Sequence, residues 1–283
     1  MKHSMKRLIL LMHCPDKKGI IAAVTNFIHQ RNGNIVYIDQ YVDRIQGAFF
    51  MRIEVEGDFD LSNFEKFKTT FKKELGEPFQ MSCSFYLADV LPKMAVFVSK
   101  YDHCLYDILA QQSSGKLACT IPFIISNHKD LEPIAKQFNI PFYHIAVSKD
   151  NKEETETKQL ELLKKYEVNC IVLARYMQIV SSRIIDVYPS KIINIHHSFL
   201  PAFPGAKPYH SAFQRGVKII GATSHYVTEE LDAGPIIEQD IIRVSHGHEV
   251  KDFILKGQDL ERIVLLRALK LHCERKIMTY NNK

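Results

Sequence analysis

The sequence has no long apolar run, no closely spaced pair of cysteines and no internal repeat, and these absences exclude several classes of protein. No apolar stretch approaches the roughly 18 residues that span a bilayer, so we predict neither a transmembrane protein nor a membrane partner. The six cysteines lie far apart, without a C-x-x-C pair or zinc-like spacing, and predict no metal site. Most stand in apolar contexts, which is typical of reduced thiols in the cytoplasm.

Charge is nearly balanced. The 283 residues carry 37 Lys and Arg against 32 Asp and Glu, a net charge of +5, and 46% of them are hydrophobic. This composition is typical of a folded globular protein and argues against disorder. So small a surplus predicts no nucleic-acid partner, although it suits an anionic small molecule. The length fits two domains, or one domain with an appendage.

Residues 1–11 combine basic residues with a short apolar stretch, as a signal peptide would. The stretch lacks a small-x-small cleavage site and runs directly into Asp16, Lys17 and Lys18. We therefore expect a first β-strand there.

The first part of the chain, residues 1–86, alternates strands and helices in the order βαββαβ, which predicts a ferredoxin-like domain. Its second helix carries phenylalanines at helical spacing and should end at Gly76, ahead of Pro78. The expected strands are 8–13, 35–42, 48–55 and 80–87, with helices starting near 20 and 64.

A linker at 87–92 leads to a second domain, residues 93–283, in which strands alternate with helices. This order predicts an α/β domain with a Rossmann-like, mainly parallel sheet. The expected strands are 94–98, 118–126, 142–146, 170–174 and 192–196, followed by a β-ribbon of 222–227 with 235–244. Helices are expected near 103–112, 130–138, 153–166 and 181–187, with one or two more between 249 and 275.

The densest polar cluster follows the strand at 192–196. Asn194 and His196 are two residues apart, so on a strand they project from the same face, at the end where open α/β sheets bind ligands. A later turn, 228–235, contains Asp232 among three carboxylates. An amide, an imidazole and a carboxylate brought together suit carbonyl chemistry, because they stabilise an oxyanion and orient a water. The alternatives are a hydrogen-bonded surface histidine, a solvated turn, and a weaker metal site on His196 and His197.

Two segments favour the interpretation that these residues are catalytic. Asn194–Gly205 contains Asn-x-His-x-Ser-x-Leu-Pro, and Gly221–Ile236 contains Asp-x-Gly. Together they resemble the formyltetrahydrofolate-dependent formyltransferase family over about residues 92–275. The resemblance implies a parallel-sheet domain that takes 10-formyltetrahydrofolate as substrate, holds no permanent cofactor and uses Asn194, His196 and Asp232 in catalysis.

The same resemblance implies a pterin pocket. It would be lined by the segment 173–181 and by the backbone of 228–231. The alternative for 173–181 is ordinary strand-to-helix core, and the two interpretations are compatible. The expected substrate-binding residues are Leu173, Tyr176, Met177, Gln178, Ile179, Val180, His197, Thr228 and Leu231.

Three features distinguish members of the family. The segment Val98–His103 lacks the glycine-rich phosphate loop of the glycinamide ribonucleotide transferases. The chain ends soon after the catalytic domain, without the basic domain of the methionyl-tRNA formyltransferases. The N-terminal module, with Pro15-Asp16-x-x-Gly19-Ile20 at its first turn, resembles an ACT domain. This arrangement, like the paired His196 and His197, is similar to that of the formyltetrahydrofolate deformylases.

The implied reaction is hydrolysis of 10-formyltetrahydrofolate to formate and tetrahydrofolate, which would supply formate for purine synthesis and balance one-carbon pools. Two alternatives remain: transfer of the formyl group to a small amine such as glycinamide ribonucleotide, and a catalytically silent folate or amino-acid sensor. The resemblance also implies a homo-oligomer controlled by methionine and glycine through Asp16, Gly19 and Asn34. A purely structural ACT pair is the alternative there.

Overall fold

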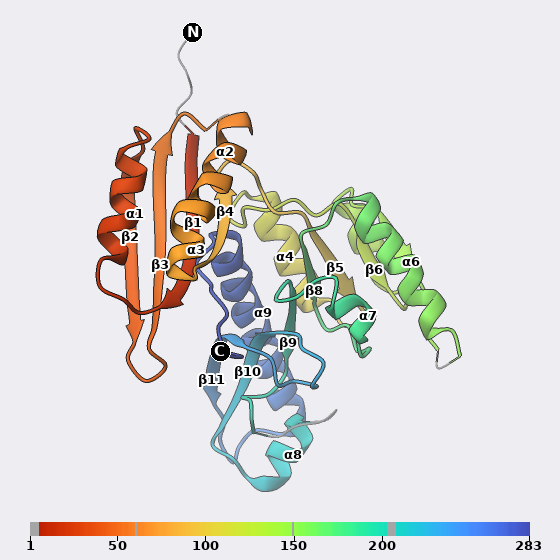
Figure 1. The fold of residues 1–283 in the computed structure, drawn as a ribbon. Helices are drawn as coiled ribbons and strands as arrows, with labels where there is room; N and C mark the ends of the chain where they lie inside the picture. Colours follow the sequence, from red (N-terminus) through yellow and green to blue (C-terminus); the bar gives the residue numbers. More distant parts are fainter. Residues whose placement is uncertain (1–5, 60, 149, 203–207) are drawn as a thin grey trace. The chain divides into compact units, whose positions relative to one another are not determined.

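A computed structural model describes residues 6–59, 61–148, 150–202 and 208–283. By packing they divide into two units, one ending at Leu91 and the other starting at Pro92. The first unit contains a four-stranded sheet and the second a seven-stranded sheet, and Figure 1 shows the strands of each. None of the helices described is long and apolar enough to cross a membrane.

The N-terminal unit is an antiparallel sheet, in the order β2-β3-β1-β4, with helices packed on it. Edge-to-face contacts between Phe27 and both Phe67 and Phe71 hold the helices together over this sheet. The ferredoxin-like prediction is confirmed, and the first strand forms where it was expected. The elements are β1 (Lys6–Pro15), α1 (Ile20–His29), β2 (Asn34–Asp43), β3 (Ala48–Gly57), α2 (Leu61–Phe71), the π-helical η1 (Lys72–Gly76), α3 (Glu77–Phe79) and β4 (Ser82–Leu87).

The second helix does not end at Gly76, as the sequence analysis expected. The chain continues through the π-helical η1 into α3, which carries Pro78 in its first turn. Proline is tolerated at that place because the N–H it lacks would have no partner inside the helix. The helical run ends only at Gln80, which adopts a left-handed φ of 55°.

The second unit is built on a sheet in the order β11-β10-β9-β8-β5-β6-β7. Strands β5 to β9 pair in parallel, and β10 and β11 are antiparallel, so the mainly parallel Rossmann-like prediction is confirmed. The strands are β5 (Met94–Val98), β6 (Ile124–Ser126), β7 (Phe142–His144), β8 (Cys170–Leu173), β9 (Ile192–His196), β10 (Ile219–Tyr226) and β11 (Ile236–Arg243). The helices are α4 (His103–Ser113), α5 (Glu132–Gln137), α6 (Lys152–Lys165), α7 (Ser182–Ile185), α8 (Pro208–Arg215) and α9 (Val250–Cys273).

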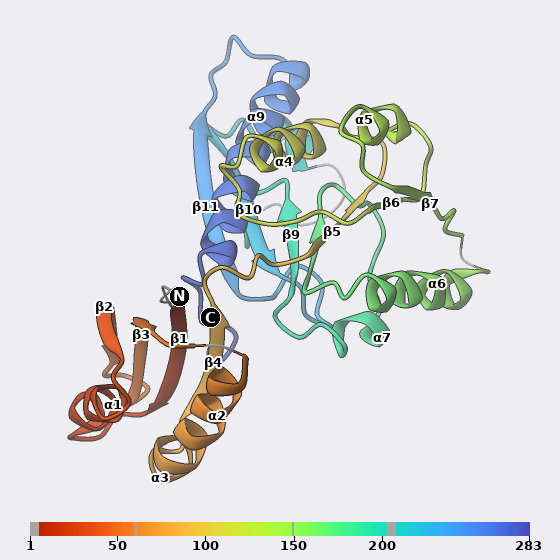
Figure 2. The same ribbon diagram turned by 90° about the horizontal axis from the view of Figure 1, so that it is seen from above.

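Helices cover both faces of this sheet, as Figure 2 shows, which is why β5 and β8 are buried throughout. Apolar side chains of α4, α5 and α9 pack on one face, and those of α6 and α7 pack on the other. The strand expected at 118–126 is confined to β6, because Pro122 cannot donate to a sheet ladder. Helix α8 was not expected, and the region 249–275, where one or two helices were expected, contains the single helix α9.

Candidate active site

Two neighbouring strands carry the polar centre of the second unit. Asn194 and His196 alternate along β9, and the antiparallel register with β10 places Asn194 opposite His225. The Nδ2 atom of Asn194 lies 3.2 Å from Nε2 of His225. The carboxylate of Asp232, from the turn between β10 and β11, lies 3.3 Å from Nδ1 of His196 and 3.7 Å from Nε2 of His225. The structure thus brings Asn194, His196 and Asp232 together, with His225 as a fourth member.

The Asp-x-Gly spacing has a steric cause in the turn that holds Asp232. Asp232 adopts a left-handed φ of 57°, and Gly234 passes against the end of β10. A Cβ atom on Gly234 would lie 1.9 Å from the carbonyl oxygen of Tyr226. The amide of Tyr226 donates a 2.9 Å hydrogen bond to the carbonyl of Pro235, which closes the turn. Only glycine allows this approach, so the motif fixes where the carboxylate points.

The two imidazoles set the charge of the aspartate. The nearby imidazoles, His196 first and His225 second, hold the pKa of Asp232 well below its usual range, so the side chain is a carboxylate at neutral pH. The far nitrogen of His196, Nε2, is buried and has no hydrogen-bond partner among the described residues. A buried polar atom without a partner marks a place where a ligand atom can bind.

These groups line a cleft of about 290 Å³. All nine residues expected to bind substrate line the same cleft, so the structure gathers them around Asn194, His196 and Asp232. Met177, Ile179 and Leu231 keep large apolar surfaces exposed there, which suits a flat aromatic ligand. Two further lining residues, Arg175 and Glu229, lie in the segments 173–181 and 228–231 that were expected to form the pocket, whereas Ile195, His225 and Val227 were not expected.

The segment 173–181 is anchored from behind by buried polar side chains. Glu156 accepts hydrogen bonds from both the amide and the hydroxyl of Ser181, at 3.0 Å and 2.5 Å. Gln159 donates to the hydroxyl of Tyr176 at 3.0 Å. The segment is therefore partly core, as the alternative interpretation held, and partly cleft wall. Residues 203–205, at the end of the first motif, lie outside the described part of the chain.

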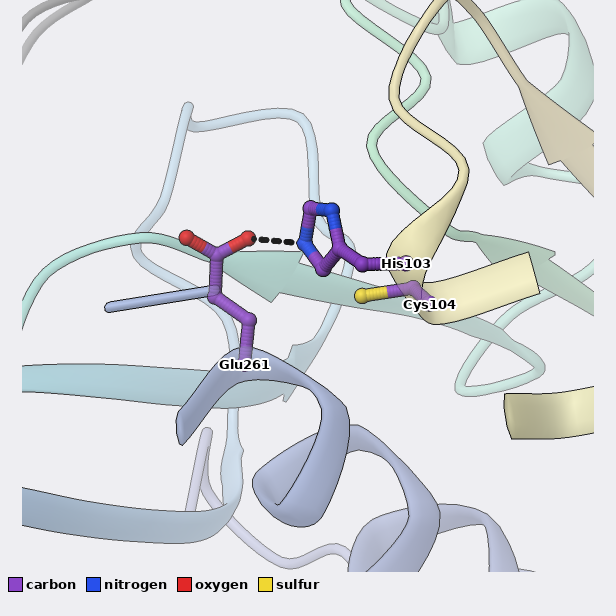
Figure 3. Close-up of side chains that lie close together, drawn as sticks. All are labelled: His103, Cys104 and Glu261. Atoms are coloured by element: carbon purple, nitrogen blue, oxygen red, sulfur yellow. Dashed lines mark hydrogen bonds and ion pairs between the residues drawn. The ribbon is translucent and has the colours of Figure 1, made fainter. Parts of the chain in front are cut away.

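A second polar cluster lies at the start of α4, where His103 and Cys104 face Glu261 of α9 (Figure 3). One ligand atom from each lies within 4.8 Å of the others, a spacing that suits a metal ion. However, the Glu261 carboxylate is already bound by Nε2 of His103 at 2.9 Å and by the Tyr209 hydroxyl at 2.6 Å. Nε of Arg175 also lies 3.5 Å from it. A guanidinium cation beside the carboxylate opposes a metal cation, so the donor set fits an internal network better than a metal centre.

The three residues expected to regulate the protein do not all meet within one chain. Asp16 and Gly19 line a surface depression with Gln40, Val42 and Phe49. Asn34 lies at the other end of β2, paired with Glu56 of β3, and does not line this depression.

His225 is the residue that sequence reasoning missed at the centre of the site. It stood inside the second motif, but its role depends on the register between β9 and β10. The signal that could have found it is its position: two strands that pair antiparallel would each place a polar residue on the same face.

Family models match both units: a formyl transferase model matches residues 92–269, and an ACT domain model matches residues 8–66. The fold and the cleft thus define a formyl transferase domain joined to an ACT domain. A formyltetrahydrofolate deformylase of Synechocystis sp. is 51% identical, over 97% of this chain and 96% of the relative. Another, from Bacillus subtilis, is 46% identical, over 97% of this chain and 91% of the relative. The chain belongs to the formyltetrahydrofolate deformylase family.

Solved structures agree with this assignment. A formyltetrahydrofolate deformylase from Pseudomonas syringae pv. tomato has a TM-score of 0.94 and 42% identity, covering 100% of this chain and 94% of that one. A glycinamide ribonucleotide transformylase from Symbiobacterium toebii has a TM-score of 0.64 and 28% identity, covering 70% of this chain and 94% of that one. The resemblance to the transformylase thus covers a smaller part of the chain.

Proposed function

We propose that this chain hydrolyses 10-formyltetrahydrofolate to formate and tetrahydrofolate, and thereby supplies formate for purine synthesis and balances one-carbon pools. The observation that carries the proposal is the convergence of Asn194, His196 and Asp232 in one cleft, beside the Nε2 atom of His196, for which the described part of the chain offers no partner. Relatives that match nearly the whole chain and are named formyltetrahydrofolate deformylase support the substrate and the reaction.

In the proposed step, a water oxygen attacks the formyl carbon and the bond from that carbon to N10 breaks. The water loses a proton and N10 gains one, so the products are formate and tetrahydrofolate. The amide of Asn194 donates to the tetrahedral oxyanion, an interaction typically worth about 2.7–4 kcal/mol of barrier. The balance needs water and side chains alone, so we propose that no bound cofactor takes part.

The roles of His196 and Asp232 follow from their contacts. The pKa of Asp232 is lowered so far by His196 and His225 that its carboxylate is a weak base. We therefore assign Asp232 to holding Nδ1 of His196. The opposite nitrogen, Nε2, has no partner in residues 6–59, 61–148, 150–202 and 208–283, and we assign to it the transfer of the proton between water, oxyanion and N10.

One assay tests the function. The protein is incubated with 10-formyltetrahydrofolate and no amine, and formate is measured. Catalytic formate release is expected. Stoichiometric binding without formate would indicate a folate sensor, and silence until an amine is added would indicate a transferase. Asp232→Asn should release formate far more slowly; near-wild-type release would contradict the mechanism.

We further propose that the ACT unit forms a homo-oligomer and binds an amino-acid effector, methionine or glycine. Strand β2 is an edge strand that exposes Val36, Ile38 and Tyr41, and such edges pair readily with a second copy. Antiparallel pairing of two β2 strands would bring Asn34 of one copy toward the depression at Asp16 and Gly19 of the other. That geometry accounts for the separation of these residues within one chain.

The oligomer proposal is tested by substituting Ile38→Asp and measuring the mass in solution, with Ile45→Asp at an exposed turn as the matched control. Dissociation is expected from the first variant alone. Formate release is then titrated with methionine and with glycine, and Asp16→Ala should abolish any response.

Because all six cysteines are free thiols and five of them are buried, we also propose that the protein works in the reducing cytoplasm.

A further inference from the structure

The strand order of the larger sheet reverses between β5 and β8. From β5 the chain proceeds outward to β6 and β7, and it then returns to β8 on the other side of β5. Open α/β sheets bind ligands in the crevice at the carboxyl ends of such a pair of strands. In this chain the segments that leave the two strands are bound to each other: Met177 N donates to Ser99 Oγ at 3.1 Å. The Arg175 guanidinium lies 4.6 Å from the centre of the Tyr101 ring.

The rest of this crevice is filled by the network around Glu261, whose side chain is fully buried. His103, Tyr209 and Arg175 reach its carboxylate from α4, from α8 and from the segment after β8 (Figure 3 shows the first of these contacts). Burial alone would raise the pKa of Glu261, yet the bond to His103, the charge of Arg175 and the bond to Tyr209 hold that pKa below its ordinary value. Arg175 adopts a left-handed φ of 62°, a conformation that is unfavourable for a residue with a Cβ atom.

A glycine in α9 makes room for the side chain of Tyr209 beside Glu261. Gly257 lies one turn before Glu261 on the same face, and a Cβ atom there would lie 2.1 Å from the Tyr209 ring. A glycine within a helix destabilises the helix relative to alanine. Both unfavourable features, the helical glycine at 257 and the left-handed backbone of Arg175, occur where side chains pack into the crevice.

The network borders the cleft in which the formyl group is proposed to react. Arg175 lines that cleft together with Asn194 and His196. On the other side, the ring of Tyr209 contacts the ring of His197 at 5.8 Å between centres, and His197 contacts His196 at 5.3 Å. The crevice thus adjoins the proposed reaction centre through Arg175 and through Tyr209, so a second substrate bound there would lie next to that centre.

We propose that Tyr101, His103, Arg175, Tyr209 and Glu261 together determine reaction specificity, by closing the switch-point crevice to an amine and leaving water as the nucleophile. The inference rests on the proposed hydrolysis and deepens it. In an opened crevice, an amine nitrogen would attack the formyl carbon and lose one proton, while the bond to N10 breaks and N10 gains a proton. Glu261, released from His103, would accept a hydrogen bond from that amine.

The test opens the crevice without leaving Glu261 unpaired. Tyr101→Ala, His103→Ala and the double variant remove two of the filling groups, while Arg175 and Tyr209 stay on the carboxylate. Tyr106→Ala, at an exposed aromatic of the same helix, is the matched control. Each protein receives 10-formyltetrahydrofolate with increasing glycinamide, and mass spectrometry measures formate and N-formylglycinamide.

Wild type and Tyr106→Ala should give formate alone, and the double variant should raise the ratio of formylated amine to formate at least tenfold. An unchanged ratio in a double variant that still releases formate would overturn the proposal. If the double variant does not fold, His103→Ala decides by the same ratio. Absence of formate from the wild-type protein would instead contradict the proposed function, so the two failures are distinguishable.

Discussion

The side-chain amide of Asn194 and the imidazole of His225 face each other across the β9–β10 ladder, with 3.2 Å between Nδ2 and Nε2. Nδ1 of His225 lies 2.9 Å from the carbonyl oxygen of Tyr226 and must donate to it. In the neutral ring, Nε2 is then an acceptor, so it receives one N–H of Asn194. This contact orients the amide and leaves its second N–H for the oxyanion.

Asn194→Ala should lower kcat by about 10²–10³, the cost of losing one oxyanion donor. KM should change little, because the interaction strengthens only in the transition state. Steady-state formate release and a thermal melt measure both properties. A variant that melts like wild type and keeps full kcat would remove Asn194 from the mechanism.

His225 is expected to act through Asn194, as a positioning residue. His225→Phe should reduce kcat by up to about 10², because the amide loses its orientation. The informative measurement is a double-mutant cycle: Asn194→Ala combined with His225→Phe should be little slower than Asn194→Ala alone. Additive losses would show that His225 acts independently. His225→Gln, which retains an acceptor, should recover part of the rate.

Gly234→Ala should destabilise the turn that carries Asp232, because the new methyl group would overlap the Tyr226 carbonyl. We expect a loss of a few kcal/mol, about 1–3, and nearly complete loss of formate release. Gly247→Ala is the matched control, since its nearest atom lies 3.9 Å away. Equal stability of the two variants in a denaturant titration would contradict the steric argument.

The stability of the second unit should fall on acidification because of His272. Its Nδ1 lies 2.8 Å from the hydroxyl of Tyr226, and burial, aided by Arg275 and Lys191, lowers its pKa to about 4. The unfolded chain takes up the proton near pH 6.5, so the free energy of unfolding should decline from about pH 6.5 to about pH 4. Above about pH 6.5 His272 is neutral in both the folded and the unfolded chain, so it does not lower the free energy of unfolding there.

Urea titrations at several pH values measure this decline. His272→Gln, which keeps an acceptor for Tyr226, should show a shallower slope in the same window. His29→Gln, at an exposed histidine of α1, serves as the control and should leave the slope unchanged. If the free energy of unfolding falls with pH equally in wild type and His272→Gln, the prediction is wrong.

The sequence predicted the order of elements well where local signals were strong. Strand β9 has the bounds expected of it because a buried apolar run is flanked by polar residues. The prediction was too long at 118–126, where Pro122 interrupts the ladder. Helix α8 has only eight residues and follows a proline- and glycine-containing stretch, so local pattern gave no sign of it.

The candidate site divides in the same way. Asn194, His196 and Asp232 stand in short motifs, and their residue types already indicated carbonyl chemistry. The Arg175–Glu261 contact joins residues 86 positions apart in sequence, on a loop and on a helix, and no local pattern relates them. Tyr209 reaches the same carboxylate only because α9 has a glycine at 257. Such contacts depend on tertiary packing and could be found only in the folded chain.

The pairing of β9 with β10 has a consequence for how the protein loses activity. Two groups of the site, Asn194 and His225, lie within a hydrogen-bonded ladder between two interior strands of the seven-stranded sheet. Interior strands that are paired on both sides open only when the whole domain does, so their amides are among the slowest to exchange with solvent. Inactivation by heat should therefore coincide with global unfolding of the second unit, with no earlier step in which an intact fold carries a disordered site.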